Sequence, residues 1–363
     1  MSSVLACAPG RVELLGNHTD YNQGVALGAA IDRGVTVAGQ KRADGIIRLK
    51  SAEGSFEIRR DAIEPQKEQR WVNYALGVVQ EYIRAGYELD GFEASVSGNL
   101  PIGAGLSSSA AFAVATAYFL LRLTGSAMDP LALARMCQKA ENAFVGVRSG
   151  LLDQATSVFG RAEHLVYLDF QTEEVQTLAF RAGFALVIAN SGNKHSLIAG
   201  EYNRRREECS SAATALGANS LHDISPAALD AARGEMDPVL YRRACHIVGE
   251  NDRVWRAVCA MRRDDLAEVG KLMNASHESS RMNFENSTPE LDALVQTAQS
   301  LSGVLGSRLT GGGFGGSTVT LVAAERAENI AAEMNEKYMA RSGHPANAFV
   351  CRIADGAAIC NRR

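Results

Sequence analysis

The chain has 363 residues, of which 46% are hydrophobic and 21% charged, and this length predicts two globular domains rather than one. Its formal net charge of −4 argues against a nucleic-acid-binding protein, because such proteins carry a basic surface that neutralises phosphates. The sequence has no apolar segment long enough to cross a membrane and no signal peptide at its start, so we expect a cytoplasmic protein without a membrane partner.

The first half of the chain predicts strands followed by a helix. Small and β-branched residues at 25–40 predict a buried strand. Residues 46–49 and 55–58 predict a hairpin whose connection is not a tight two-residue turn. Apolar and polar residues alternate at 92–97, as in a half-buried strand. A glycine-rich turn follows, and residues 108–123 then predict a helix whose apolar stretch is buried.

The second half of the chain predicts mainly helices with a few strands. Residues 184–189 predict a buried strand, and residues 317–323 predict another after the glycine-rich loop 311–316. Helices are predicted at 201–216, 237–262, 265–281 and 289–300. We place the two domains at 1–175 and 176–363, and we expect a small-molecule site at their interface, where such sites often lie.

A segment rich in glycine and serine, 98–111, joins a predicted strand to a predicted helix. Glycines let the backbone approach a ligand closely, and a helix N-terminus offers free N–H groups and a positive dipole, so the segment predicts a cradle for polyphosphate. It is not a Walker A loop, because Ala104 stands where that motif requires lysine. A plain turn with Ser107 or Ser108 as the helix N-cap is the structural alternative.

A polar segment near the start of the chain, 10–24, places arginine, histidine, aspartate and amides between glycines. Sugars and other hydroxyl-rich ligands need such a mixture of donors and acceptors. Asp20 can accept hydrogen bonds from two hydroxyls, and Arg11 can donate to phosphate oxygens. A polar loop that caps a strand would explain the same residues without a ligand.

A third segment, 309–318, leads into a predicted strand and includes five glycines in six positions. Such a backbone bends sharply or packs closely against another group. The segment therefore predicts a loop that covers a nucleotide or a sugar, and a simple bulge is the alternative.

In this order the three segments resemble the signature motifs of the GHMP kinases. Residues 10–21 resemble the signature of the galactokinase family, whose pattern is GRVNLIGEHTDY, whereas this chain has GRVELLGNHTDY. Further blocks that match the family are 152–154, 190–209, 287–292 and 308–316. The resemblance covers nearly the whole chain.

The resemblance implies the α+β, two-domain GHMP kinase fold, with a ribosomal S5-like N-terminal domain, a ferredoxin-like C-terminal domain and the active site between them. It implies an ATP-dependent, galactokinase-type phosphotransferase that phosphorylates the anomeric C1 hydroxyl of galactose to give galactose 1-phosphate. ATP and the sugar are then the small-molecule partners, and Mg²⁺ is the cofactor. The oligomeric state, monomer or dimer, does not follow from the resemblance.

The resemblance also implies roles for individual residues. Asp153 corresponds to the catalytic aspartate and Arg11 to the arginine beside it. The sugar contacts correspond to Asn17, His18, Asp20, Gly150 and Tyr202. The ATP-binding loop corresponds to Gly103, Ala104, Gly105, Leu106, Ser107, Ser108 and Ser109. Ser109 and Glu141 correspond to the residues that hold Mg²⁺, a hard cation that takes oxygen ligands and keeps several waters.

Three of these positions also have a structural explanation. Glu141 lies in a predicted helix, where a solvated carboxylate is common, and Tyr202 fits a core tyrosine with a solvated hydroxyl. Asp153 fits the cap of a helix that begins at Gln154. The residues alone do not separate these explanations from the roles that the resemblance implies.

Two polar positions of the signature depart from the family pattern. Glu13 replaces the usual asparagine, and Asn17 replaces the usual glutamate, which the resemblance implies accepts a hydrogen bond from the C6 hydroxyl. Asn17 lacks the charge that repels a C6 carboxylate, so galacturonate is an alternative substrate unless the loop turns Glu13 inward. A non-catalytic, galactokinase-like sugar sensor or regulator is a second alternative, although residues 108–110 and Asp153 are intact.

Overall fold

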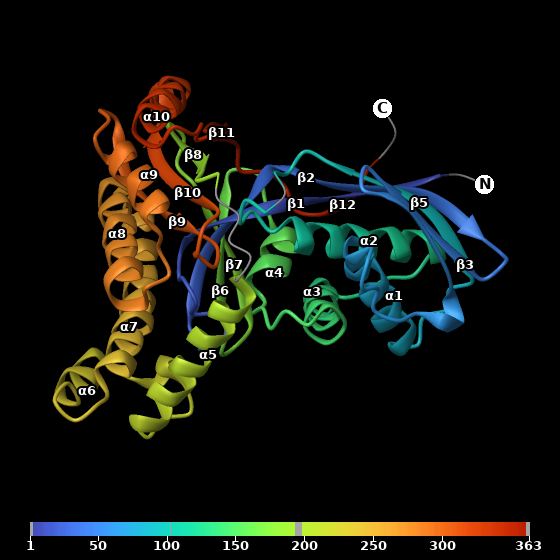
Figure 1. Ribbon diagram of the computed structural model, residues 1–363, viewed down its shortest axis with the longest axis horizontal. Helices are drawn as coiled ribbons and strands as arrows, with labels where there is room; N and C mark the ends of the chain where they lie inside the picture. Colours follow the sequence, from blue (N-terminus) through green and yellow to red (C-terminus); the bar gives the residue numbers. More distant parts are fainter. Residues whose placement is uncertain (1–2, 102, 193–197, 361–363) are drawn as a thin grey trace.

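The computed structural model describes residues 3–101, 103–192 and 198–360. These residues form two β-sheets with flanking helices (Figure 1). The first sheet extends to the right in Figure 1, and helices α7 to α10 lie to the left beside the second sheet. The block 190–209, which matches the galactokinase pattern, includes residues 193–197, and these lie outside the described residues.

The first sheet has the strand order β12-β1-β2-β5-β3-β4, and β6 and β7 join it through β2. Its strands are β1 Val4–Leu15, β2 Val25–Arg42, β3 Ile46–Ser51, β4 Gly54–Arg59, β5 Gly91–Gly98, β6 His164–Asp169, β7 Glu174–Ala179 and β12 Ala358–Ile359. Helices α1 Asn73–Arg84, α2 Ser108–Thr124, α3 Pro130–Ala140 and α4 Leu152–Phe159 lie on one side of it (Figure 1). Most of α2 is buried, as the sequence predicted.

The hairpin of β3 and β4 has a tighter turn than the sequence predicted. Ser51 pairs with Gly54 across the two strands, so that only Ala52 and Glu53 form the turn. Gly54 has a φ of 132°, a conformation that glycine adopts without strain, and β4 therefore begins directly after the turn. The prediction of a longer connection was wrong, because Gly54 belongs to the strand and not to the loop.

The second sheet has the strand order β11-β8-β10-β9. Its strands are β8 Phe184–Asn190, β9 Val304–Thr310, β10 Ser317–Ala323 and β11 Phe349–Cys351. The helices after α4 are α5 Ile198–Ala215, α6 Pro226–Ala231, α7 Pro238–Arg262, α8 Leu266–Ser279, α9 Pro289–Gln299 and α10 Ala327–Ser342. Within the described ranges, none of the helices combines the length and the apolar character that a membrane span requires.

Short sequence signals mark where two helices of this half, α7 and α9, begin. The side chain of Asp237 accepts backbone N–H groups at the start of α7, and that of Thr288 does so at the start of α9. A proline follows each of these caps, and proline suits the first helical turn because its missing N–H would have no partner there. The helices predicted at 237–262 and 289–300 are therefore found close to their expected bounds.

The chain returns to the first sheet after it has built the second. β12 pairs with β1, with Ala6 opposite Ile359. β7 ends the first sheet at Ala179, and β8 begins the second at Phe184. We therefore propose a domain boundary in the connection 180–183, and the expected division at residue 175 stays a prediction.

A buried glutamate on α7 fixes the loop that follows β1. The carboxylate of Glu250 accepts the backbone N–H groups of Gly16 and Asn17, each at 2.9 Å, and the side-chain N–H of Arg253 at 2.6 Å. Burial acts to raise the pKa of Glu250, but Arg253, Arg308 and the hydrogen bonds hold the pKa well below its usual range. The loop is thus tied to the second half of the chain by a buried charge.

Replacing Glu250 with glutamine should destabilise the protein by about 3–5 kcal/mol, the usual effect of removing one partner of a buried ion pair. Because the pKa of Glu250 is lowered in the folded state, its carboxylate stabilises the fold at pH values above its unfolded pKa of about 4.3, and this contribution is lost as the pH falls toward the folded pKa. Urea unfolding should therefore show a weaker loss of stability on acidification from about pH 4.5 to pH 2 in E250Q than in wild type.

Asp252→Asn is the matched control on the same helix. Asp252 is 53% exposed and pairs with Arg256 at 3.5 Å, and an exposed pair of this kind contributes about 0–1 kcal/mol. Equal unfolding free energies for E250Q and wild type would show that the buried carboxylate does not hold the loop.

Candidate active site

Arg11 on β1 and Asp153 on α4 form an ion pair. The Nε and Nη2 atoms of Arg11 lie 2.7 and 2.6 Å from Oδ1 of Asp153. Asp153 lies in the first turn of α4, where the positive end of the helix dipole favours a carboxylate. The side chain of Asp153 is 24% exposed and that of Arg11 only 6%, so the pair presents its carboxylate to a ligand.

Ser107 bonds the other oxygen of the same carboxylate. Its hydroxyl donates to Oδ2 of Asp153 at 2.5 Å. Ser107 stands at the N-cap position of α2 with a φ of 58°, but its side chain makes no capping hydrogen bond. The capping roles that the sequence left open for these two residues are therefore not found, because their side chains bond each other instead.

The glycine–serine loop lines a large cavity of about 570 Å³. The predicted ATP-binding residues on its wall are Gly103, Gly105, Leu106, Ser107, Ser108 and Ser109. Ala104 does not line it; the residue is buried, and its carbonyl accepts a hydrogen bond from Ser317 at 2.7 Å. The cavity is also lined by Trp71, Tyr74 and residues 51–53, at the end of β3 and in the turn after it. Aromatic rings together with a helix N-terminus suit a nucleotide with its phosphates at the helix.

A small cavity of about 340 Å³ adjoins the large one. Four residues line both cavities: Arg11, Ser109, Asp153 and Gly312. The predicted sugar contacts all line the small cavity: Asn17, His18, Asp20, Gly150 and Tyr202. Two ligands that occupy the two cavities would therefore meet at the ion pair of Arg11 and Asp153.

Glu141 lines the small cavity and is only 6% exposed, so it is not a solvated helix carboxylate. It accepts hydrogen bonds from Ser149 at 2.9 Å and from Gln154 at 2.7 Å, and the nearby hydroxyl of Ser109 also favours its charged form. Burial, followed by the negative charge of Asp153, raises the pKa of Glu141 to about 7, against the effect of these hydrogen bonds. A cation beside Glu141 and Ser109 would relieve the repulsion between the two carboxylates.

His18 and Asp20 form part of the small cavity's wall. The Nε2 atom of His18 donates to the carbonyl of Gly312 at 2.9 Å, and the hydroxyl of Tyr21 donates to Nδ1 at 2.8 Å, an assignment that follows from the carbonyl's need for a donor. Burial lowers the pKa of His18 to about 4, so its ring is neutral near physiological pH. Burial raises the pKa of Asp20 to about 7, and the negative charges of nearby carboxylates, Glu13 first, add to this effect.

Gly150 and Tyr202 lie against these two residues. A Cβ atom at Gly150 would stand 2.0 Å from Oδ2 of Asp20, so no larger residue fits without moving the carboxylate. The ring of Tyr202 lies 5.0 Å from that of His18, and burial raises the pKa of its phenol. Since Tyr202 borders the small cavity, it is not simply a core residue.

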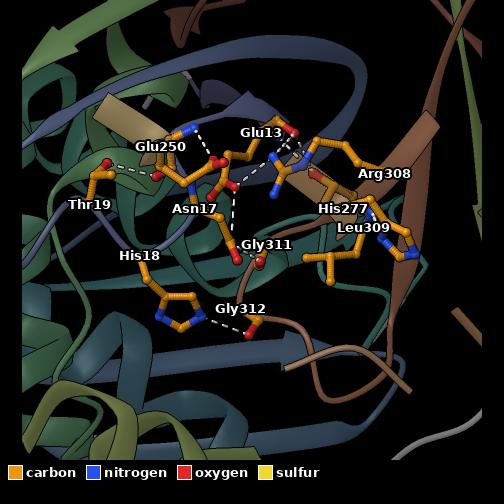
Figure 2. Close-up of polar contacts among 12 residues, drawn as sticks. Glu13, Asn17, His18, Thr19, Glu250, His277, Arg308, Leu309, Gly311 and Gly312 are labelled. Atoms are coloured by element: carbon orange, nitrogen blue, oxygen red, sulfur yellow. Dashed lines mark hydrogen bonds and ion pairs between the residues drawn. The ribbon is translucent and has the colours of Figure 1, made fainter. Parts of the chain in front are cut away.

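Glu13 and Asn17 also line the small cavity, where they meet residues of the second half of the chain (Figure 2). Nδ2 of Asn17 donates to Oε1 of Glu13 at 3.0 Å and to the carbonyl of Gly311 at 2.8 Å. Nη1 of Arg308, which is fully buried, donates to Oε1 of Glu13 at 2.9 Å. Sequence reasoning missed Arg308, since nothing in its local sequence indicates a partner on β1.

Three family models match the chain. They are the GHMP kinases N terminal domain over residues 73–161, the galactokinase galactose-binding signature over residues 2–41, and the GHMP kinases C terminal domain over residues 257–340. Among curated proteins, the galactokinase of Roseiflexus sp. (strain RS-1) is 41% identical over 97% of this chain and 92% of its own length. The galactokinase of Homo sapiens is also 41% identical, over 97% of this chain and 91% of its own length.

Solved structures also match the fold of this chain. The galactokinase of Lactococcus lactis complexed with galactose has a TM-score of 0.95 and 34% identity, and the match covers 99% of this chain and 95% of that one. The mevalonate kinase of Methanococcus jannaschii has a TM-score of 0.69 at 17% identity, over 98% of this chain and 99% of that one, which is a likeness of fold alone.

Proposed function

The chain belongs to the galactokinase family of the GHMP kinases, and on that premise we propose that it transfers the γ-phosphoryl group of ATP to the C1 hydroxyl of galactose. It is a kinase, and its α+β fold is the two-domain GHMP kinase fold, as the sequence predicted. The Lactococcus lactis structure, which contains galactose, supports galactose as the sugar.

The observation that carries the proposal is the meeting of the two cavities at Arg11 and Asp153. The large cavity, with the N-terminus of α2 on its wall, accommodates ATP, and the small cavity accommodates the sugar. Transfer of a phosphoryl group needs the attacking hydroxyl and the phosphorus atom to be held in line. The shared wall is where such an alignment occurs.

Asp153 is the residue that we assign to the sugar hydroxyl. Its carboxylate accepts from Arg11 and Ser107, so its position is fixed before the substrate arrives. It orients the C1 hydroxyl and accepts its proton as the bond to phosphorus forms. Arg11 stabilises the negative charge of the aspartate, and because it lines both cavities it can stabilise the transferring group as well.

Ser109 and Glu141 fit a Mg²⁺ ion. They offer a hydroxyl and a carboxylate, and both line the small cavity. The described residues contain no group of three or more metal-ligating side chains, but Mg²⁺ needs fewer because it keeps waters and binds phosphate oxygens. The ion would neutralise charge on the ATP phosphates.

Asp153→Asn should lower kcat by ~10²–10⁴-fold, the usual effect of removing a positioned acid–base group, while the affinity for ATP stays near that of wild type. A coupled ADP-release assay with galactose measures the rate, and calorimetry without sugar measures ATP binding. Asp129→Asn is the control, since Asp129 caps α3 from an exposed position. A wild-type kcat in D153N would show that the assignment is wrong.

The same assay separates the kinase from a non-catalytic sugar sensor. We expect the wild-type protein to release ADP when galactose is present, because Ser107, Ser109 and Asp153 all line the cavities. A sensor would need only to bind the two ligands and would not need these residues for catalysis. Binding of both ligands without ADP release would favour the sensor instead.

Ser109→Ala and Glu141→Ala should each raise the Mg²⁺ concentration needed for half-maximal rate, by roughly tenfold. The loss is partial because the ATP phosphates still bind the ion. Initial rates over a Mg²⁺ titration at fixed ATP measure the effect. If the titration curves of both variants overlay that of wild type, neither residue holds the metal.

A further inference from the structure

Asn17 has no donor left to offer a sugar. Both hydrogens of its amide are used, one by Glu13 at 3.0 Å and one by the carbonyl of Gly311 at 2.8 Å. Its carbonyl oxygen already accepts from Asn286 at 2.8 Å. Asn17 therefore cannot donate a hydrogen bond to the C6 carboxylate of galacturonate, and only its lack of charge still favours that sugar.

Glu13, in contrast, has a free acceptor. Its Oε1 atom accepts from Arg308 and Asn17. Its Oε2 atom accepts no hydrogen bond from the described residues and is not among their enclosed, unpartnered atoms, and Glu13 lines the small cavity. β1 therefore turns Glu13 toward the small cavity, with one oxygen held by hydrogen bonds and the other free to accept one from a ligand.

Neighbouring cations hold this carboxylate in place. Arg308 is fully buried and contacts Glu13 at 2.9 Å. Burial raises the pKa of Glu13, and the charges of Arg308 and Arg11 oppose that shift. A buried carboxylate fixed by a guanidinium group keeps its direction when a ligand binds, which a solvated side chain would not.

The strand sets the distance from Glu13 to the reacting end of the sugar. Arg11 and Glu13 are two residues apart on β1, within a regular stretch of pairing to β2. They therefore point to the same face of the strand at a separation of about 7 Å. That separation suits a single pyranose ring, whose C1 lies at Asp153 and whose opposite side lies at Glu13.

We propose that Glu13 determines sugar specificity: its free oxygen accepts a hydrogen bond from a hydroxyl on the side of the ring remote from C1, and its charge excludes sugars with a carboxylate there. This inference rests on the proposed function. Relative to the galactokinase pattern, the carboxylate and the amide have exchanged positions between 13 and 17, and the two side chains still bond each other at 3.0 Å.

The test is a comparison of substrates in wild type and Glu13→Gln. With galactose, E13Q should lose roughly 10–100-fold in kcat/KM, since a hydrogen bond to a charged group is removed. With 6-deoxygalactose or 4-deoxygalactose, whichever lacks the bonded hydroxyl, the loss should shrink to about twofold or less. The ratio of kcat/KM for galacturonate to that for galactose should rise in E13Q, since the repelling charge is gone.

Two further variants separate specificity from folding. Glu13→Asp keeps a charge for Arg308, and it should keep the discrimination against galacturonate even if E13Q folds poorly. Glu208→Gln is the matched control: Glu208 bonds the buried Arg243 at 2.6 Å and lines neither cavity. It should lower the melting temperature and leave the ratios between sugars unchanged.

The outcomes distinguish this inference from the function on which it rests. Equal losses of kcat/KM for galactose and both deoxy sugars in E13Q, with an unchanged galacturonate ratio, would overturn the role of Glu13 and leave the kinase in place. A galacturonate ratio that rises in E13D as much as in E13Q would also overturn it. Failure of the wild-type protein to phosphorylate galactose would overturn both proposals.

Discussion

The loop 16–24 depends on the buried carboxylate of Glu250 for hydrogen-bond partners that it cannot provide itself. Its first two N–H groups point into the protein, where an unpaired donor is costly, and Glu250 accepts both. The carbonyl of Asn17 is matched in the same way by His246, at 3.2 Å. Because these partners come from α7, the wall of the small cavity takes its shape only when the two halves of the chain pack together.

The two cavities differ in charge, and this difference suits two different ligands. The small cavity is lined by four carboxylates: Glu13, Asp20, Glu141 and Asp153. Their burial and mutual repulsion raise the pKa of two of them to about 7, and such a wall favours neutral ligands rich in hydroxyls. The large cavity has the N-terminus of α2 and Arg11 on its wall, and it favours anionic phosphates. The ion pair of Arg11 and Asp153 lies where the two cavities meet.

Elements with a clear local sequence signal could be predicted from the sequence. Features that depend on contacts between distant segments were missed. Residues 108–123 formed a buried helix because their apolar run was unambiguous, whereas β1 read as a polar motif although most of it is buried. The resemblance to a family is the source of the roles proposed for Asp153 and its neighbours. It did not supply the direction of Glu13, because that is set by Arg308, which lies on another sheet, and no pattern in either segment encodes the pairing.

The pairing of β12 with β1 has a consequence for how the protein is made. β1 is synthesised before β12, and the two residues that pair with β12, Ala6 and Cys7, find these partners more than 350 residues later in the chain. During synthesis, the outer backbone groups of these two residues therefore have no strand partner until β12 has emerged. Unpaired strand edges of nascent chains are sites of mispairing, so this part of the β1 edge stays open to such mispairing until β12 is in place.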